Sequence, residues 1–317
     1  MRYTAAPNRS RTGFAGVYPI LYAFFDQDGR VDRAAMERQV EACIAGGAAG
    51  IAVLGLVTEV HKLDTAERRE IVDIVAAAIA GRVPLAVTVA EQNVRGQVEF
   101  VRAAEAAGAA WVILQPPSTK GYAEAEYLRF LGAVAEKTTL PVAIQNNPTN
   151  LDVALTNAGL IALARNHPNV RLLKGEGPAI NVARLIEESD GAFDVFCGHG
   201  GKELLTNMRS GCVGLIPAPD VFDIQVRILG LLASGRPEDA DAAERMHKDI
   251  LPLITFMLQS IPILLAYGKR LTARRLGLSQ VHPRVPDLAP TPFGLAEVER
   301  MTRTLGAFPA AAQRISA

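Results

Sequence analysis

The segment Val170-Arg171-Leu172-Leu173-Lys174-Gly175-Glu176-Gly177-Pro178 decides the fold. Its apolar start is typical of a buried strand, and the glycines and proline after Lys174 mark a turn into a helical pattern near Ile180. In a (β/α)8 barrel, Lys174 would lie at the carboxyl end of the sixth strand, on the face that carries active sites. Burial there disfavours the ammonium form, so the amine could attack a carbonyl. The alternative is a surface lysine that closes a strand.

Short apolar runs alternate with longer helical patterns from Gly16 onward. The predicted strands cover residues 17–22, 50–54, 84–89, 111–114, 141–144, 170–173, 193–196 and 213–216. The predicted helices after them cover residues 33–44, 65–79, 95–107, 123–136, 156–164, 180–188, 202–210 and 222–233. Parallel strands need crossover helices, so eight such units predict an α/β protein with a (β/α)8 TIM barrel. An open doubly wound sheet is the alternative, without a Gly-x-Gly-x-x-Gly fingerprint to support it.

The domain organisation follows from this alternation. Residues 1–15 are predicted to be an N-terminal arm, residues 16–235 the barrel, and residues 236–317 a C-terminal helical extension. We expect breaks in the extension at Pro252, Pro262 and Gly277. A proline cluster, Pro283, Pro286, Pro290 and Pro292, predicts an extended connector before the last helix.

The composition narrows the class of partner. Lys+Arg and Asp+Glu both number 33, so no overall charge favours nucleic acid or an anionic membrane. No run of about 18 apolar residues is present, and the first sixteen residues lack the apolar core of a signal peptide. Three scattered cysteines do not form a disulfide framework. We therefore expect a cytoplasmic protein that acts on a small molecule.

Polar residues follow the predicted strands and would share one rim of the barrel. They are Thr58, Glu59 and His61 after the second strand, Gln115 after the fourth, Gln145 and Asn146 after the fifth, Lys174 and Glu176 after the sixth, and His199 after the seventh. This rim is rich in amides and poor in clustered cations. It favours a small hydroxylated acid over a polyphosphate.

Four features of the chain resemble the class I aldolase superfamily that includes dihydrodipicolinate synthase and N-acetylneuraminate lyase. They are the loop Gly55-Leu56-Val57-Thr58-Glu59, Pro148 after the fifth strand, Lys174, and Gly214 in the eighth strand. The resemblance covers about residues 16–305. It implies that Lys174 forms a Schiff base with a 2-keto acid, commonly pyruvate, and that the protein is a homodimer or homotetramer.

The chain also departs from that family's pattern. Leu56 and Val57 replace two hydroxyl residues that bind the keto-acid carboxylate and relay protons, which leaves Thr58 as the hydroxyl of this loop. Gln145 stands in place of the catalytic tyrosine, and Pro117-Ser118 replaces a second aromatic pair. Without the tyrosine–threonine relay, dihydrodipicolinate synthesis and sialic acid cleavage are not expected.

A narrower resemblance points to dehydration. Gln145-x-x-Pro148, Pro116-Pro117 before Gly121, and Lys174-x-Glu176 are similar to 2-keto-3-deoxy sugar acid dehydratases, particularly the L-2-keto-3-deoxyarabonate dehydratase type. An iminium at C2 acidifies the C3 protons, and the enamine can then expel the C4 hydroxyl to give 2-oxoglutarate semialdehyde. Two alternatives remain open: a pyruvate-dependent aldolase, and a barrel that binds a keto acid without catalysis.

These considerations assign a role to each candidate residue. The expected catalytic residues are Lys174, His199 and Gln145, and the expected substrate-binding residues are Val57, Thr58, Glu59, Gln115, Asn146 and Glu176. For His199 an ordinary loop histidine is the alternative, for Glu59 a helix-start residue, and for Gln145 and Asn146 a structural bond in the turn. Cys197-x-His199 lacks further ligands for a metal, and the iminium itself serves as electron sink. We therefore expect no metal and no organic cofactor.

Overall fold

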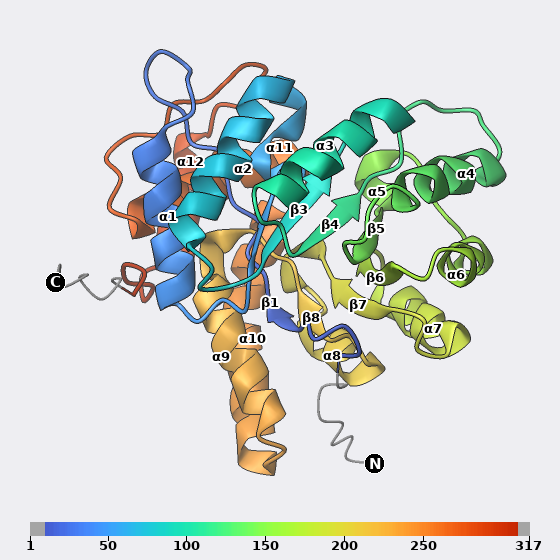
Figure 1. Ribbon diagram of the computed structural model, residues 1–317. Coiled ribbons are helices and arrows are strands. Elements are labelled where there is room, and N and C mark those ends of the chain that lie inside the picture. The colour runs from blue at the N-terminus through green and yellow to red at the C-terminus, as the bar shows by residue number, and fades with distance from the viewer. Residues whose placement is uncertain (1–9, 310–317) are drawn as a thin grey trace, which may run out of the picture.

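The computed structural model of the protein describes residues 10–309, so residues 1–9 of the predicted arm lie outside the described residues. Eight parallel strands form one curled sheet in the order β1-β8-β7-β6-β5-β4-β3-β2 (Figure 1). The strands are β1 (Gly16–Val17), β2 (Ile51–Val53), β3 (Leu85–Val89), β4 (Trp111–Leu114), β5 (Val142–Asn146), β6 (Val170–Gly175), β7 (Asp194–Cys197) and β8 (Gly214–Leu215). All eight predicted strands are therefore present.

The first strand is shorter than predicted, because this segment changes partner along its length. Gly16 and Val17 pair with β8, and the Ile20 backbone N–H still donates to Pro217 O on that side. On the other side, Ile20 bridges Ala52 of β2, and the Leu21 N–H donates to the Ala52 carbonyl at 2.9 Å. Pro19 between them has no N–H to donate. The β1 and β2 edges of the sheet are thus joined by a few backbone hydrogen bonds rather than by a long ladder of them.

Helices surround this sheet on its outside (Figure 1). They are α1 (Arg33–Ala45), α2 (Thr65–Ile79), α3 (Val94–Ala106), α4 (Glu124–Ala135), α5 (Pro148–Leu151), α6 (Asn157–Asn166), α7 (Ala179–Ser189), α8 (Leu204–Ser210) and α9 (Phe222–Ala233). The short α5 was not predicted: Asn147 caps it by accepting from the Asn150 N–H, and Pro148 occupies its first turn. None of the helices in residues 10–309 is long and apolar enough to cross a membrane.

Three aromatic side chains meet in the interior of the sheet. Tyr18, Trp111 and Phe196 come from the β1, β4 and β7 segments, which are not neighbours in the sheet. Their ring centroids nevertheless lie 5.2 to 5.6 Å apart. Only contact across the interior brings these segments together. The cluster therefore closes the interior between strands that are not neighbours in the sheet.

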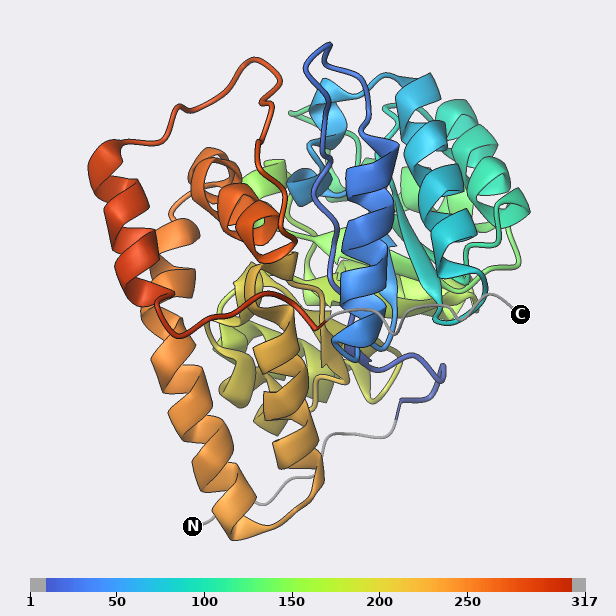
Figure 2. The same ribbon diagram turned by 90° about the vertical axis from the view of Figure 1, so that its left-hand side faces the viewer.

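Three helices, α10 (Pro237–Met257), α11 (Ile261–Arg275) and α12 (Pro292–Met301), follow the eight units. The predicted break at Pro252 is wrong, because α10 continues through it. Pro262 instead lies in the first turn of α11, where no donor is required. In Figure 2, α10 runs beside α9, and an extended connector leads from α11 to α12, as the proline cluster predicts.

Candidate active site

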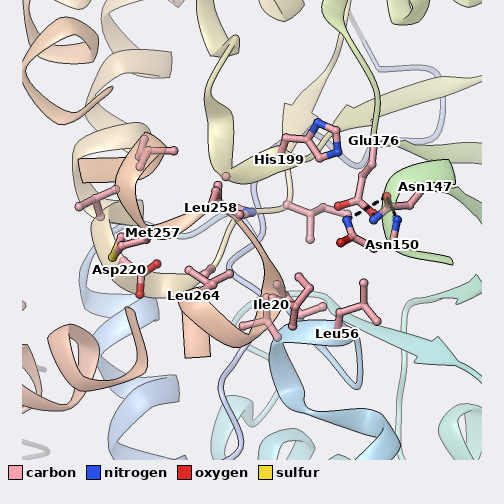
Figure 3. A pocket seen from close by; sticks show the side chains of 18 of the residues that line it. Ile20, Leu56, Asn147, Asn150, Glu176, His199, Asp220, Met257, Leu258 and Leu264 are labelled. Atoms are coloured by element: carbon pink, nitrogen blue, oxygen red, sulfur yellow. Dashed lines mark hydrogen bonds between the residues drawn. The ribbon is translucent and has the colours of Figure 1, made fainter. Parts of the chain in front are cut away.

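Lys174 lies near the carboxyl end of β6, and only 4% of its surface is exposed. Because side chains alternate along a strand, Lys174 shares the inward face with Leu172 and Glu176. It lines a narrow cavity of about 60 Å³ (Figure 3). The lining residues are Ile20, Leu56, Val57, Asn147, Asn150, Lys174, Glu176, His199, Gly200, Ile216, Pro217, Ala218, Asp220, Val221, Gln225, Ile254, Met257, Leu258, Ile261 and Leu264.

Glu176 is the immediate partner of the lysine. Its Oε2 lies 3.4 Å from Lys174 Nζ, and it accepts hydrogen bonds from Gln145 Nε2 at 2.5 Å and Asn147 Nδ2 at 2.9 Å. All four side chains are buried. A buried carboxylate needs such donors, because it has lost the hydrogen bonds of water. The arrangement holds one carboxylate oxygen beside the amine.

A row of amides extends behind Glu176. Gln115 Nε2 donates to Gln145 Oε1 at 2.8 Å, and this directs the amide group of Gln145 toward the carboxylate. Gln97 of α3 in turn donates to the backbone carbonyl of Gln115. Gln115 and Gln145 are buried but do not line the cavity. The structure therefore places them in support of Glu176 rather than in the expected contact with substrate.

His199 follows β7 and lines the cavity with a left-handed backbone, φ 51°. Its ring nitrogen Nε2 is buried and has no hydrogen-bond partner among the described residues. The glycines on either side of it do not leave open space. A Cβ on Gly198 would lie 2.4 Å from Glu176 Cγ, and one on Gly200 would lie 2.2 Å from Leu258 Cδ1. They are required for close packing around the histidine.

The loop after β2 contributes an apolar wall. Leu56 and Val57 line the cavity, whereas the Thr58 hydroxyl donates to the Leu21 carbonyl at 2.6 Å and accepts from the Leu54 N–H at 3.0 Å. Thr58 is fully buried. Its hydroxyl is thus already paired, and the structure places it in the loop's own framework instead of the expected substrate contact.

Glu59 is directed away from Lys174. Its two carboxylate oxygens lie 2.7 Å from Lys269 Nζ of α11 and 2.7 Å from Lys62 Nζ. Desolvation lowers the pKa of Lys269, which the Glu59 carboxylate opposes. Glu59 lines a larger neighbouring cavity of about 630 Å³, which shares Leu56, Asn150 and Ile261 with the first. Glu59 therefore links the loop to α11.

Asn146 and His61 also lie outside the lysine cavity. The Asn146 side chain donates to the Leu155 carbonyl at 3.0 Å and accepts from its N–H at 3.1 Å, so it ties the strand-five turn, as the structural alternative expects. His61 lines the neighbouring cavity, and burial lowers its pKa.

Sequence reasoning missed four polar residues of the cavity, namely Asn147, Asn150, Asp220 and Gln225. Asn147 is two positions after Gln145, so strand alternation could have identified it. Asp220 comes after β8, in the short helix η4 (Pro219–Val221). Asp220 is the first polar residue after the eighth strand, and this position could have identified it.

No group of three or more His, Cys, Asp and Glu side chains suited to a metal occurs within residues 10–309. Cys197 and Cys212 are both buried with free thiols. The neighbouring Cys212 and burial raise the pKa of the Cys197 thiol. Both effects favour the neutral form of the Cys197 thiol.

The chain is similar in sequence to known proteins. The chain is 28% identical over 296 residues to 4-hydroxy-tetrahydrodipicolinate synthase of Methanosarcina mazei, covering 92% of this chain and 99% of that protein. It is 28% identical over 244 residues to a putative 2-dehydro-3-deoxy-D-gluconate aldolase of Escherichia coli, covering 76% of this chain and 80% of that protein.

Solved structures match the fold. A dihydrodipicolinate synthase from Rhodopseudomonas palustris superposes with a TM-score of 0.85 at 24% identity, covering 94% of this chain and all of that one. The model of the dihydrodipicolinate synthetase family matches residues 13–292. The chain belongs to the dihydrodipicolinate synthetase family.

Proposed function

We propose that this protein is a (β/α)8-barrel lyase that forms a Schiff base through Lys174 and dehydrates a 2-keto-3-deoxy sugar acid such as L-2-keto-3-deoxyarabonate. The observation that carries the proposal is the buried pair of Lys174 Nζ and Glu176 Oε2, 3.4 Å apart in one cavity. Family membership supports a lyase.

The first steps use the amine. Lys174 transfers a proton to the Glu176 carboxylate, and its free amine attacks the C2 carbonyl to give a carbinolamine. The carbinolamine hydroxyl takes this proton back from Glu176 and leaves as water, which gives the iminium and restores the carboxylate. Apolar side chains line most of the cavity, which excludes water from this intermediate. The amides of Asn147 and Asn150 are available to donate to the substrate's carboxylate or hydroxyl oxygens.

Elimination then needs one base and one acid. We assign the base to Glu176, whose carboxylate takes a proton from C3 as the C3–H electrons move toward the iminium nitrogen. The resulting enamine expels the C4 hydroxyl, which leaves as water after receiving a proton from Glu176 or from His199. Hydrolysis frees Lys174, and tautomerisation of the unsaturated product gives 2-oxoglutarate semialdehyde. The net change is the loss of one water.

The lining of the cavity favours elimination over aldol cleavage. Among the described lining residues there is no Ser, Thr or Tyr, so no hydroxyl relay contacts the lysine. Cleavage requires a base for the C4 hydroxyl, and Gln145 is a neutral amide that donates to Glu176 and cannot accept that proton. Elimination needs only the carboxylate already beside the amine.

A pyruvate-releasing aldolase is the second candidate. The observation that favours it is the similarity to the putative 2-dehydro-3-deoxy-D-gluconate aldolase and to a probable 2-dehydro-3-deoxy-D-pentonate aldolase of Escherichia coli. The two reactions share the Schiff base and differ in whether a carbon–carbon bond breaks.

One assay separates these reactions. We expect the purified protein to convert L-2-keto-3-deoxyarabonate into a product one water lighter, detected by mass spectrometry, with no pyruvate in a coupled lactate dehydrogenase assay. Stoichiometric pyruvate would replace the dehydratase by the aldolase. A trapped adduct without any turnover of a panel of 2-keto-3-deoxy acids would instead indicate the non-catalytic binder.

A further inference from the structure

The cavity of Lys174 has a second polar group at its opposite side. Asp220 lines the cavity and is only 4% exposed. Figure 3 shows its carboxyl group on the far side from Glu176 and Asn147, with Ile20 and Leu264 between them. The mechanism above gives Asp220 no role. A buried carboxyl group in a mostly apolar wall requires an explanation, because its burial costs free energy.

The hydrogen bonds of Asp220 are one-sided. Tyr22 Oη and Thr272 Oγ1 both donate to Oδ1, each at 2.9 Å. No donor from the described residues reaches Oδ2. A Cβ on Gly268 would lie 2.5 Å from Tyr22 Oη and 2.9 Å from Asp220 Oδ1, so this glycine lets α11 approach the pair. The carboxyl group is thus held firmly by one oxygen while the other remains available.

Among the described residues, no cationic side chain is hydrogen-bonded to this carboxyl group. The guanidinium of Arg275 donates to the Asp220 backbone carbonyl at 2.8 Å and forms a bidentate ion pair with Asp223 at 2.7 and 2.9 Å. Burial raises the pKa of Asp220 to about 6, while the donors Tyr22 and Thr272 and the charge of Arg275 oppose that rise. The group is therefore mostly a carboxylate at pH 7 to 8, and a carboxylate is a strong acceptor.

We propose that Asp220 is a specificity-determining residue whose Oδ2 accepts a hydrogen bond from a hydroxyl group at the distal end of the 2-keto acid held by Lys174. This inference rests on the proposed Schiff base at Lys174. Among the described lining residues, the amide oxygen of Gln225 is another unpaired acceptor, but it is uncharged and therefore a weaker acceptor than the Asp220 carboxylate. Pyruvate has no such hydroxyl and does not use this contact. The site thus selects hydroxylated keto acids over simple ones, since an acceptor left unpaired disfavours the analogue that lacks the donor.

Asp220→Asn tests this directly, because the amide keeps a carbonyl oxygen for Tyr22 and Thr272 but cannot accept at the second position. At pH 7.5 we expect kcat/KM for L-2-keto-3-deoxyarabonate to fall about 10- to 100-fold, mainly through a higher KM. Covalent trapping of pyruvate by borohydride should be unchanged. Asp249→Asn, at an exposed position of α10 outside the cavity, is the control and should alter kcat/KM by no more than about twofold.

The outcomes are distinct. An equal loss of pyruvate trapping and turnover in Asp220→Asn, or an unchanged KM with a lower Tm, would assign Asp220 to structure alone and overturn the proposal. Failure of the wild-type protein to trap any 2-keto acid would refute the Schiff base itself, which is a separate result. Trapping with normal pyruvate affinity in the variant, together with a raised KM for the hydroxylated substrate, would support the distal contact.

Discussion

Lys174→Ala is expected to abolish turnover of the 2-keto acid, by at least about 10⁴-fold, and to remove the borohydride-stable adduct. No other group in the cavity can form an iminium, because Lys174 is the only lysine among its described lining residues. The fold should persist, since Glu176 keeps its hydrogen bonds from Gln145 and Asn147. Intact mass before and after reduction, followed by peptide mapping, measures the adduct and its position.

A second buried lysine makes the mapping informative. Lys269 is as buried as Lys174, but it is bound to Glu59 at 2.7 Å and lies 4.8 Å from the centroid of the Phe25 ring. It should remain unmodified. Lys120→Ala, an exposed lysine paired with Asp152, serves as the control and should keep its activity within about twofold. An adduct on Lys269, or activity retained by Lys174→Ala, would refute the assignment.

Glu176→Gln is expected to reduce turnover by about 10²- to 10⁴-fold, the range typical for loss of a general acid–base group. The amide of the variant cannot take the C3 proton. It also replaces the carboxylate oxygen that accepts from Gln145 and Asn147 and lies beside Lys174, so either its NH₂ group or its carbonyl oxygen must face these three groups. Pyruvate should still be trapped at Lys174, more slowly. Single-turnover kinetics with and without borohydride separate the two steps.

Glu203→Gln is the matched control for this experiment. Glu203 Oε2 accepts from the Ala179 N–H at the start of α7 and does not line the cavity. A glutamine can keep that acceptor, so turnover should stay within about twofold. Turnover of Glu176→Gln within about threefold of the wild-type rate would show that another group removes the C3 proton.

Local sequence signals were sufficient for several of the helices, although they missed α5 and the continuation of α10 through Pro252. The predicted bounds of α2 and α9 agree with the structure to the residue. In α2 the reason is visible: Asp64 accepts from the Glu67 N–H, and Glu67 accepts from the Asp64 N–H, which closes a capping box at the first turn. Such signals depend on neighbours three or four residues away, so they can be read without the rest of the chain.

The position of Lys174 was also determined by the sequence. A buried strand that ends in lysine, with Gly and Pro beyond it, places that side chain on the rim of a parallel barrel whatever the details of packing. The replacement of the family's catalytic tyrosine by Gln145 could likewise be read from the sequence, because a glutamine side chain has no phenol group.

The roles of the other rim residues depended on distances that no sequence pattern encodes. Thr58 and Asn146 carry the groups expected of substrate ligands, yet both are saturated by backbone partners. Glu59 pairs with Lys269, 210 positions away in the chain. A polar side chain binds whichever partner the folded chain brings nearest.

The sequence by itself determined the succession of strands and helices, the family, and the amine at the end of β6, because each depends on local pattern or residue identity. Only the tertiary structure decided which polar groups share the cavity with that amine. Glu176 follows Lys174 by two residues on β6, but its donors Gln145 and Asn147 come from the neighbouring β5 segment. Asp220 enters because α11 packs against the segments that follow β1 and β8. Those contacts are set by long-range packing, in which each buried polar atom must find a partner among distant segments.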